Sequence, residues 1–563
     1  MRQLLKYISF PLLAAGCLAS CHKVDVAVTT ELTADSYPLT AAQFTSVSGS
    51  VYVALRSAYS VDYFFMQTIS SNEAILPAFG GNWYDGDKYE QLHNHKWNKD
   101  NGWVNSCWSY LTNIIGTSNQ VLSILRSATE STAKQTTISE VRTVRALAYY
   151  YMMDLYGNVP IDTAYGSTKL NTNTPRAQVF SFIESEIKAS LPALSRASGA
   201  ATYGRPNTYA AYALLAKMYL NAAYYTGTQR NNDCIIACDS VINAGGGSLY
   251  GLEARSSYLQ MFYPTNGPTM KEFIFAIPYD ASVTTGYMFH ARYDLNRNQG
   301  IRFLYSGSTP GSITNPVMNH TYSGSGLLNS KPSGPESVLP EYYAYFSDPN
   351  DIRNAQWLTG LQYWPDGSPV QVETTKKGYD ASYSGTDGSA VYTYQLNLTP
   401  GVYYRSTATG ANASAFDLGN DEVAWNMGYR NNKFYPDYTN TTSRNQSNDV
   451  PVFRYSDILL MKAEAILRGG TATQGQTALS LANQLRANRT TSAAWSTITL
   501  DSVYNERARE FSWETWHRND MIRFGKFEDA YGFKTDADAN HRIFPIPTTA
   551  FATNSTLTQN TGY

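Results

Sequence analysis

The chain contains few charged residues, few cysteines and almost no long apolar segments. Only 16% of its 563 residues are charged, and the formal net charge is -2. A domain that binds nucleic acid usually concentrates Lys and Arg on one face, so this balance excludes nucleic acid as an expected partner. The hydrophobic content of 43% is that of a large globular protein with a sizeable core.

The five cysteines do not form the spacing of a disulfide framework or a zinc site. Cys17 and Cys21 lie close to the N-terminus, which leaves Cys107, Cys234 and Cys238. Cys234 and Cys238 stand four residues apart, as on one helical face, but no second pair of ligands accompanies them. We therefore expect both to be small buried apolar residues, and we expect neither a metal ion nor a cofactor.

The one pronounced apolar segment lies within residues 1–20, after the basic Arg2 and Lys6. It is too short to span roughly 30 Å of hydrocarbon comfortably, which favours a signal peptide. Leu18-Ala19-Ser20-Cys21 follows and resembles a bacterial lipobox, which implies that Cys21 carries lipid after cleavage. Cys17 is the weaker alternative, and an ordinary signal peptide with an incidental cysteine is a further one.

The rest of the chain divides into helical and loop-rich parts. Apolar residues step by three and four between Val141 and Leu155 and again between Ala211 and Ala222, which indicates helices. Gly, Ser, Thr, Asn, Pro and Tyr dominate the middle, apart from a short strand expected at 271–277. The fold class we predict is mainly α, a tetratricopeptide-like helical-repeat scaffold with a large loop-rich, partly β insertion. The expected parts are a tether at 21–46, a helical-repeat region at 47–248, the insertion at 249–450, further helices completing the scaffold at 451–530, and an extended tail at 531–563.

Five motifs in order resemble the SusD/RagB family of nutrient-binding outer-membrane lipoproteins from Bacteroidota. They are Val144–Leu147 with Asp154–Pro160, Gly204–Pro206 with Ala213–Leu220, Arg454–Ala465, Glu506–Phe511 with Arg518–Arg523, and Phe544–Pro547 with Gln559–Tyr563. The resemblance implies tetratricopeptide-like helix pairs that support a variable region. It also implies a protein held at the cell surface by lipid, which captures a glycan and delivers it to a SusC-like TonB-dependent transporter.

The charged motif residues are expected to hold the scaffold together as buried ion pairs and helix caps. They are Arg145, Asp154, Arg454, Asp457, Glu506 and Arg523.

Glycan recognition needs flat aromatic rings for the sugar faces and carboxylates, amides or Arg for the hydroxyls. Two segments fit. The first is a glycine-flanked early loop, and the second lies in the insertion, which the resembled family also uses for binding. The predicted ligand-binding residues are Asn72, Glu73, Trp83, Tyr84 and Asp85 in the first segment, and Tyr287, Tyr305 and Trp364 in the second. Trp97, Trp103 and Trp108 are expected in the core.

Three alternatives to a glycan-binding protein remain open. A surface glycoside hydrolase would need two carboxylates at a defined separation, and no motif selects such a pair. A peptide or glycopeptide receptor could use the same architecture. A protein-interaction scaffold is the third, because tetratricopeptide repeats commonly bind proteins.

Overall fold

The computed structural model describes Tyr37 and residues 40–78, 83–285, 334–363 and 445–563. Between 303 and 435 it also describes short stretches at 303–304, 312–315, 320–323, 367, 369, 371–374, 392–402, 416–418 and 426–435. The predicted signal peptide and Cys21 lie outside these residues. None of the helices in the described ranges has the length and apolarity needed to cross a bilayer.

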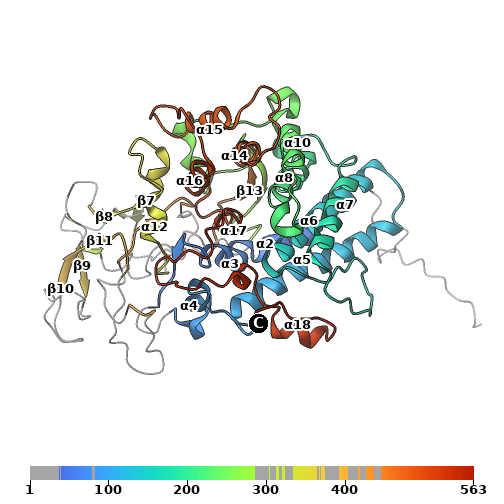
Figure 1. The fold of residues 1–563 in the computed structure, drawn as a ribbon, viewed down its shortest axis with the longest axis horizontal. Helices are drawn as coiled ribbons and strands as arrows, with labels where there is room; N and C mark the ends of the chain where they lie inside the picture. The colour runs from blue at the N-terminus through green and yellow to red at the C-terminus, as the bar shows by residue number, and fades with distance from the viewer. Residues whose placement is uncertain are drawn as a thin grey trace, which may run out of the picture.

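The N-terminal helices pack side by side as a curved row (Figure 1). Helix α5 lies against α6, α6 against α7, and α8 against α10. Side-chain caps fix several of the starts: Asn101 accepts from the first turn of α5, Ser131 from that of α6, and Asn207 from that of α8. The helices of this part are α2 (Ala41–Ser57), α3 (Phe64–Thr68), α4 (Lys88–His93), α5 (Gly102–Ser127), α6 (Thr132–Tyr156), α7 (Arg176–Ser190), α8 (Thr208–Leu220), α9 (Ala222–Thr226) and α10 (Asn231–Ile242).

Helices from the C-terminal part extend this row. Helix α10 packs against α14, although more than two hundred residues separate them, and α14 in turn packs against α15 and α16. The helical scaffold is therefore built from two segments that lie far apart in the sequence. The C-terminal helices are α14 (Tyr455–Leu467), α15 (Ala478–Arg486), α16 (Leu500–Glu510), α17 (His517–Arg523) and α18 (Thr548–Thr553). The last of these interrupts the tail that we expected to be extended.

The insertion leaves and rejoins the scaffold at one pair of strands. Strand β2 (Phe273–Ile277) pairs antiparallel with β13 (Val450–Arg454), and all ten residues are buried. The strand predicted at 271–277 is thus confirmed, and its partner lies at the far end of the insertion. The other strands are short: β1 (Ala74–Ile75), β3 (Phe303–Leu304), β4 (Ser312–Asn315), β5 (His320–Ser323), β6 (Ser337–Val338), β7 (Trp357–Leu358), β8 (Gly360–Leu361), β9 (Gln371–Thr374), β10 (Tyr392–Gln395), β11 (Asn397–Leu398) and β12 (Arg430–Asn431).

Short helical elements connect these parts. They are the π turn η1 (Tyr59–Tyr63), the 3-10 turns η2 (Asp85–Asp87), η3 (Gly199–Ala201), η4 (Ala244–Gly247), η5 (Arg255–Ser257), η6 (Leu259–Phe262), η7 (Ile352–Gln356) and η8 (Ala539–Arg542), and the helix α12 (Pro340–Tyr343).

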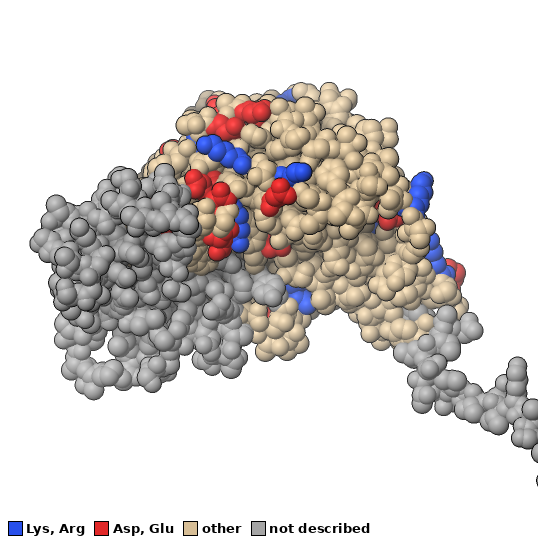
Figure 2. Space-filling model, turned by 90° about the horizontal axis from the view of Figure 1, so that it is seen from below, with Lys and Arg blue, Asp and Glu red and all other residues tan. Residues whose placement is uncertain are grey.

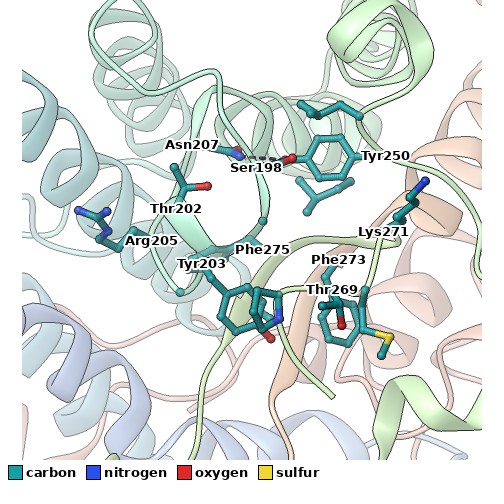
Figure 3. Close-up of a pocket in the computed structure, with 17 residues that line it drawn as sticks. Ser198, Thr202, Tyr203, Arg205, Asn207, Tyr250, Thr269, Lys271, Phe273 and Phe275 are labelled. Carbon is teal, nitrogen blue, oxygen red and sulfur yellow. Dashed lines mark hydrogen bonds between the residues drawn. The ribbon is translucent and has the colours of Figure 1, made fainter. Parts of the chain in front are cut away.

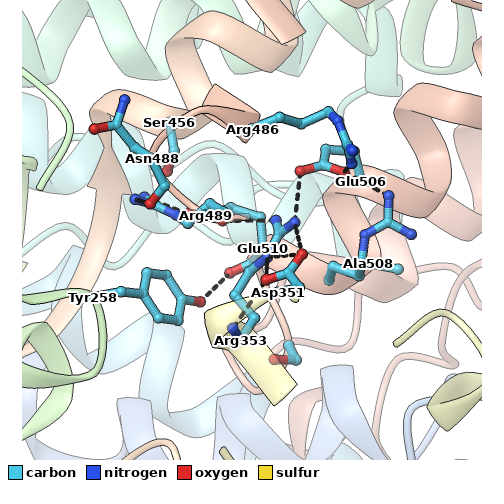
Figure 4. A network of polar contacts seen from close by, with 12 residues as sticks. Tyr258, Asp351, Arg353, Ser456, Arg486, Asn488, Arg489, Glu506, Ala508 and Glu510 are labelled. Carbon is cyan, nitrogen blue, oxygen red and sulfur yellow. Dashed lines mark hydrogen bonds and ion pairs between the residues drawn. The ribbon is translucent and has the colours of Figure 1, made fainter. Parts of the chain in front are cut away.

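A buried network of charged side chains ties the insertion to the C-terminal helices (Figure 4). The guanidinium of Arg353, in η7, lies 2.8 Å from Glu506 and 3.0 Å from Glu510, both on α16. Arg454 lies 2.8 Å from Glu510. Burial would raise the pKa of Glu506, but the positive charges of Arg353 and Arg509 hold that pKa at about 2. The network therefore stays charged inside the protein.

The other charged motif residues are also buried and paired, as predicted. Asp457 lies 2.6 Å from Lys217 and 2.8 Å from Arg507. Asp154 differs, because it is held by hydrogen bonds from the Tyr225 hydroxyl at 2.7 Å and the Asn519 amide at 2.8 Å. The remaining pairs are Arg145 with Glu186, and Arg523 with Glu464 and Asp520.

Candidate functional site

The early loop presents its aromatic and acidic side chains on a strained backbone. Trp83, Asp85 and Asp87 have φ values of 63°, 46° and 59°, in the left-handed region that side-chain-bearing residues rarely adopt. Such conformations cluster at ligand-binding sites, where the surrounding structure maintains them. Trp83 and Tyr84 are half-buried, whereas Asp85 is exposed and forms an ion pair with Lys88 at 3.2 Å.

Helix α4 supports this loop from one side. The ring of Trp83 lies 6.1 Å from that of Tyr89, which in turn contacts the buried ring of Trp103 at 5.5 Å. Trp97, Trp103 and Trp108 are 3%, 8% and 6% exposed, so the prediction that they belong to the core is confirmed.

The structure places Asn72 and Glu73 inside the protein, where they join distant segments. The side-chain oxygen of Asn72 lies 2.6 Å from Nε2 of His517. Glu73 accepts hydrogen bonds from the backbone N–H of Trp513 at 2.5 Å and from the Tyr342 hydroxyl at 3.1 Å. Both side chains are buried and have internal partners, so ligand contact in the early segment is now expected only of Trp83, Tyr84 and Asp85.

Burial raises the pKa of Glu73 to about 8, against the smaller opposing effect of its hydrogen bonds. Burial also lowers the pKa of His517 to about 4. At neutral pH the histidine is therefore uncharged, and its Nε2–H donates to Asn72.

The structure brings the early loop and the insertion together. Strand β1 pairs with β6 of the insertion. Ala78 then exchanges backbone hydrogen bonds with the segment around Asp417: its N–H donates to Phe416 at 3.0 Å, and its carbonyl accepts from Leu418 at 2.8 Å. The early loop is thus joined at two points to a region more than two hundred residues away.

An exposed phenylalanine from the C-terminal segment lies beside these elements, and the sequence analysis missed it. Phe533 is 43% exposed, and its ring centroid lies 6.4 Å from that of Phe416 and 6.3 Å from that of His93 on α4. The signal available in the sequence was the neighbouring Gly532. In the structure this glycine has a positive φ of 48°, in the turn that precedes Phe533. We call Trp83, Tyr84 and Asp85 the early-loop surface, and Phe533 contacts the helix α4 that supports it.

Of the candidates in the insertion, Tyr287, Tyr305 and Trp364 lie outside the described residues. Tyr363, which directly precedes Trp364, is described and is 50% exposed. Its backbone forms a bridge with Pro369.

A pocket between the N-terminal helices and β2 is lined by groups that already have partners (Figure 3). The amide of Asn207 donates to the Tyr250 hydroxyl at 2.8 Å, while its oxygen caps α8. Tyr203 donates to Asp449 at 2.5 Å. The cavity measures about 200 Å³, which is below the range of roughly 300–1,000 Å³ that is usual for small-molecule sites. We interpret it as a packing junction at the base of the insertion.

The architecture defines a class: a helical-repeat scaffold that carries a loop-rich insertion held at its base by paired strands and buried charges. Sequence comparison gives the family. A model described as the SusD family matches residues 271–563, and one described as "Starch-binding associating with outer membrane" matches residues 35–220. The chain belongs to the SusD family, and the predicted family is confirmed.

Two curated relatives match along most of their length. The starch-binding protein SusD of Bacteroides thetaiotaomicron is 25% identical over 525 residues, covering 89% of this chain and 86% of the relative. The SusD-like protein P25 of Formosa agariphila is 23% identical over 487 residues, covering 82% of this chain and 80% of the relative.

Solved structures share the fold. A laminarin-binding SusD-like protein superposes with a TM-score of 0.65 at 21% identity, covering 94% of this chain and 100% of the other. Surface glycan-binding protein A from Bacteroides uniformis superposes with a TM-score of 0.65 at 17% identity, covering 92% of this chain and 99% of the other. The predicted helical-repeat fold is confirmed.

Proposed function

We propose that this protein is a non-enzymatic glycan-binding lipoprotein of the outer cell surface, which delivers its ligand to a SusC-like TonB-dependent transporter. The observation that carries the proposal is the early-loop surface. It combines aromatic rings and a carboxylate on a strained backbone, hydrogen-bonded to the insertion, in a chain of the SusD family. The names of the starch-, laminarin- and glycan-binding relatives support the class of ligand.

The chemistry of the early-loop surface suits a sugar. The half-exposed ring of Trp83 offers a flat apolar surface for the face of a pyranose, and the exposed carboxylate of Asp85 accepts hydrogen bonds from ring hydroxyls. Each aromatic contact contributes on the order of 0.5–1.5 kcal/mol beyond burial. A net binding free energy of roughly -4 to -8 kcal/mol corresponds to millimolar to micromolar affinity, which suits capture followed by release.

Binding is tested with an array of oligosaccharides and a parallel library of peptides, followed by calorimetry with the best array member. Trp83→Ala is expected to weaken glycan binding while leaving the thermal midpoint nearly unchanged. The matched control is Trp495→Ala, because Trp495 is also a half-buried tryptophan in a surface loop, where Arg486 lies over its ring. Binding of peptides alone would replace the glycan proposal with a peptide receptor.

The same incubation tests the absence of catalysis. Chromatography of the bound oligosaccharide after prolonged contact should show no shorter products. Cleavage that disappears in a single carboxylate variant would make the protein a hydrolase.

The anchor and the partner are tested in cells. Cys21→Ser should abolish incorporation of labelled palmitate and release the protein from the outer membrane, whereas Cys17→Ser should do neither. Affinity purification of the wild-type protein from detergent-solubilised outer membrane should recover a TonB-dependent barrel. Recovery without any such barrel would contradict the delivery role.

A further inference from the structure

A groove on the scaffold, distinct from the early-loop surface, runs along the outer face of α5. It encloses about 620 Å³, within the range of small-molecule sites. Helix α5 forms the floor, the segment 162–167 forms one wall and α18 the other. Both walls are fixed: Asn119 of α5 donates to the carbonyl of Asp162 at 3.0 Å, and Thr549 of α18 donates to Asn105 of α5.

The floor of the groove carries almost no charge. Arg126 is the only charged residue in the 26 residues of α5, whereas the chain average of 16% would give about four. The solvent-facing positions along the groove are Ser109, Asn113, Gly116 and Gln120. Helix α18 lies on the lower side in Figure 1, the side shown in Figure 2, and a broad part of that side carries few charged side chains. A solvated helix face usually carries Lys and Glu, so this composition needs another explanation.

Gly116 supplies a second observation. It lies in the interior of a long helix, where glycine is destabilising relative to alanine. A Cβ added there would meet no atom within 4 Å, so packing inside the protein does not require a glycine. What the glycine does is to keep the floor of the groove open and let another molecule approach the helix backbone.

The side chains around the floor offer an aromatic ring and amide groups, which suit a neutral ligand rich in hydroxyls. Tyr165 is 58% exposed on one wall, and its hydroxyl accepts a hydrogen bond from Gln120 at 3.2 Å, which holds the ring beside α5. Trp108 is 94% buried at the floor. Asn113 and Gln120 add exposed amides.

We propose that this groove is a second carbohydrate-binding site that takes a neutral oligosaccharide. Tyr165 stacks on a sugar face, and the amides of Asn113 and Gln120 bind hydroxyls. This proposal rests on the proposed function, because it assigns the same class of ligand to a separate surface.

The test separates the two sites by substitution. The probe is an array of neutral oligosaccharides that includes starch and laminarin fragments, followed by calorimetry with the best-bound member. Gly116→Leu fills the groove without disturbing internal packing, and Tyr165→Ala removes the exposed ring. Their matched controls are Ser123→Leu, on the exposed side of α5 outside the groove, and Tyr165→Phe. All four are measured in the wild-type and in the Trp83→Ala background.

We expect Gly116→Leu and Tyr165→Ala to weaken binding about 2- to 10-fold in the wild-type background. Both should also remove the binding that persists in Trp83→Ala. Ser123→Leu should change neither, and Tyr165→Phe, which keeps the ring but loses the hydrogen bond from Gln120, should weaken binding less than Tyr165→Ala does. Wild-type affinity in both groove variants, with binding lost in Trp83→Ala, would overturn the second site and leave the proposed function intact. An array on which the wild-type protein binds no glycan would overturn both. Loss of barrel recovery in Gly116→Leu with unchanged glycan binding would make the groove a protein interface.

Discussion

The Nη2 atom of Arg353 lies 2.8 Å from Oε1 of Glu506, and both side chains are fully buried. Arg353 belongs to the insertion, and Glu506 belongs to a helix of the scaffold. The variable part of the protein is thus positioned by a charge pair inside the fold as well as by the strand pair at its base. Water cannot stabilise either charge here, so each depends on its partners.

Glu506→Gln should therefore be strongly destabilising. It leaves the buried guanidiniums of Arg353 and Arg509 without a full counter-charge, and breaking a buried pair commonly costs about 3–5 kcal/mol. Chemical denaturation measures the change in the free energy of unfolding. Lys188→Gln is the control, because Lys188 is 56% exposed and pairs with Glu184 at 2.6 Å. A surface pair contributes about 0–1 kcal/mol, so equal losses in the two variants would contradict the importance of the network.

Replacing glycine by alanine should have opposite effects on stability at two positions. At Gly116, in the open interior of α5, it should raise the free energy of unfolding by about 0.5–1 kcal/mol. At Gly204 the backbone has a φ of 73°, and a Cβ would lie 2.8 Å from Cγ of Pro278. A left-handed conformation alone costs an alanine about 1–2 kcal/mol, and the close contact adds to that. Thermal denaturation of the two variants checks the difference in sign.

Asp85→Asn should separate binding from stability. The Asp85 side chain, which pairs with Lys88, is 47% exposed. Loss of this ion pair should therefore change the free energy of unfolding by no more than about 1 kcal/mol. Loss of the negative charge should weaken glycan binding, because a carboxylate accepts stronger hydrogen bonds from hydroxyls than an amide does. Calorimetry with the best-bound oligosaccharide measures the effect. Unchanged affinity would remove Asp85 from the early-loop surface.

The helical scaffold was predictable because its information is local. Apolar residues recur at helical spacing around Val141 and Ala211, and Asn207 precedes its helix as a cap. The partners of the charged motif residues were not predictable in the same way. Arg353 meets Glu506 across more than one hundred and fifty residues, and no local pattern specifies that pairing.

The candidate site shows the same limit. A glycine-flanked loop with Trp83 and Asp85 could be selected from the sequence, and both residues lie at or near the surface. Asn72 and Glu73 had the right chemistry for sugar hydroxyls, but their burial depends on His517, Trp513 and Tyr342 from distant segments. Phe533 was missed for the opposite reason, because its neighbours Phe416 and His93 come from other parts of the chain.

Glu73 should make stability depend on pH between about 4.5 and 8. Its pKa is about 8 in the folded protein and 4.5 as an ordinary carboxyl, so the folded state keeps a proton that the unfolded state loses. The stabilisation is complete below about pH 4.5 and is lost as the pH rises to about 8, with a slope of at most about 1.4 kcal/mol per pH unit. In Glu73→Gln the amide at position 73 does not titrate, so this contribution is absent.

The stability of Glu73→Gln relative to wild type should therefore rise with pH from about 5 to about 8 and level off above that range. Denaturation curves of both proteins across this range measure the difference, which cancels the contributions of His517 and other titrating groups. Glu528→Gln is the matched control: its pairing with Arg542 lowers the pKa of Glu528, so its contribution is lost only when the pH falls below about 4.5. Parallel pH profiles for wild type and Glu73→Gln would show that the carboxyl is ionised in the folded protein, with its charge balanced by Lys433 or by solvent.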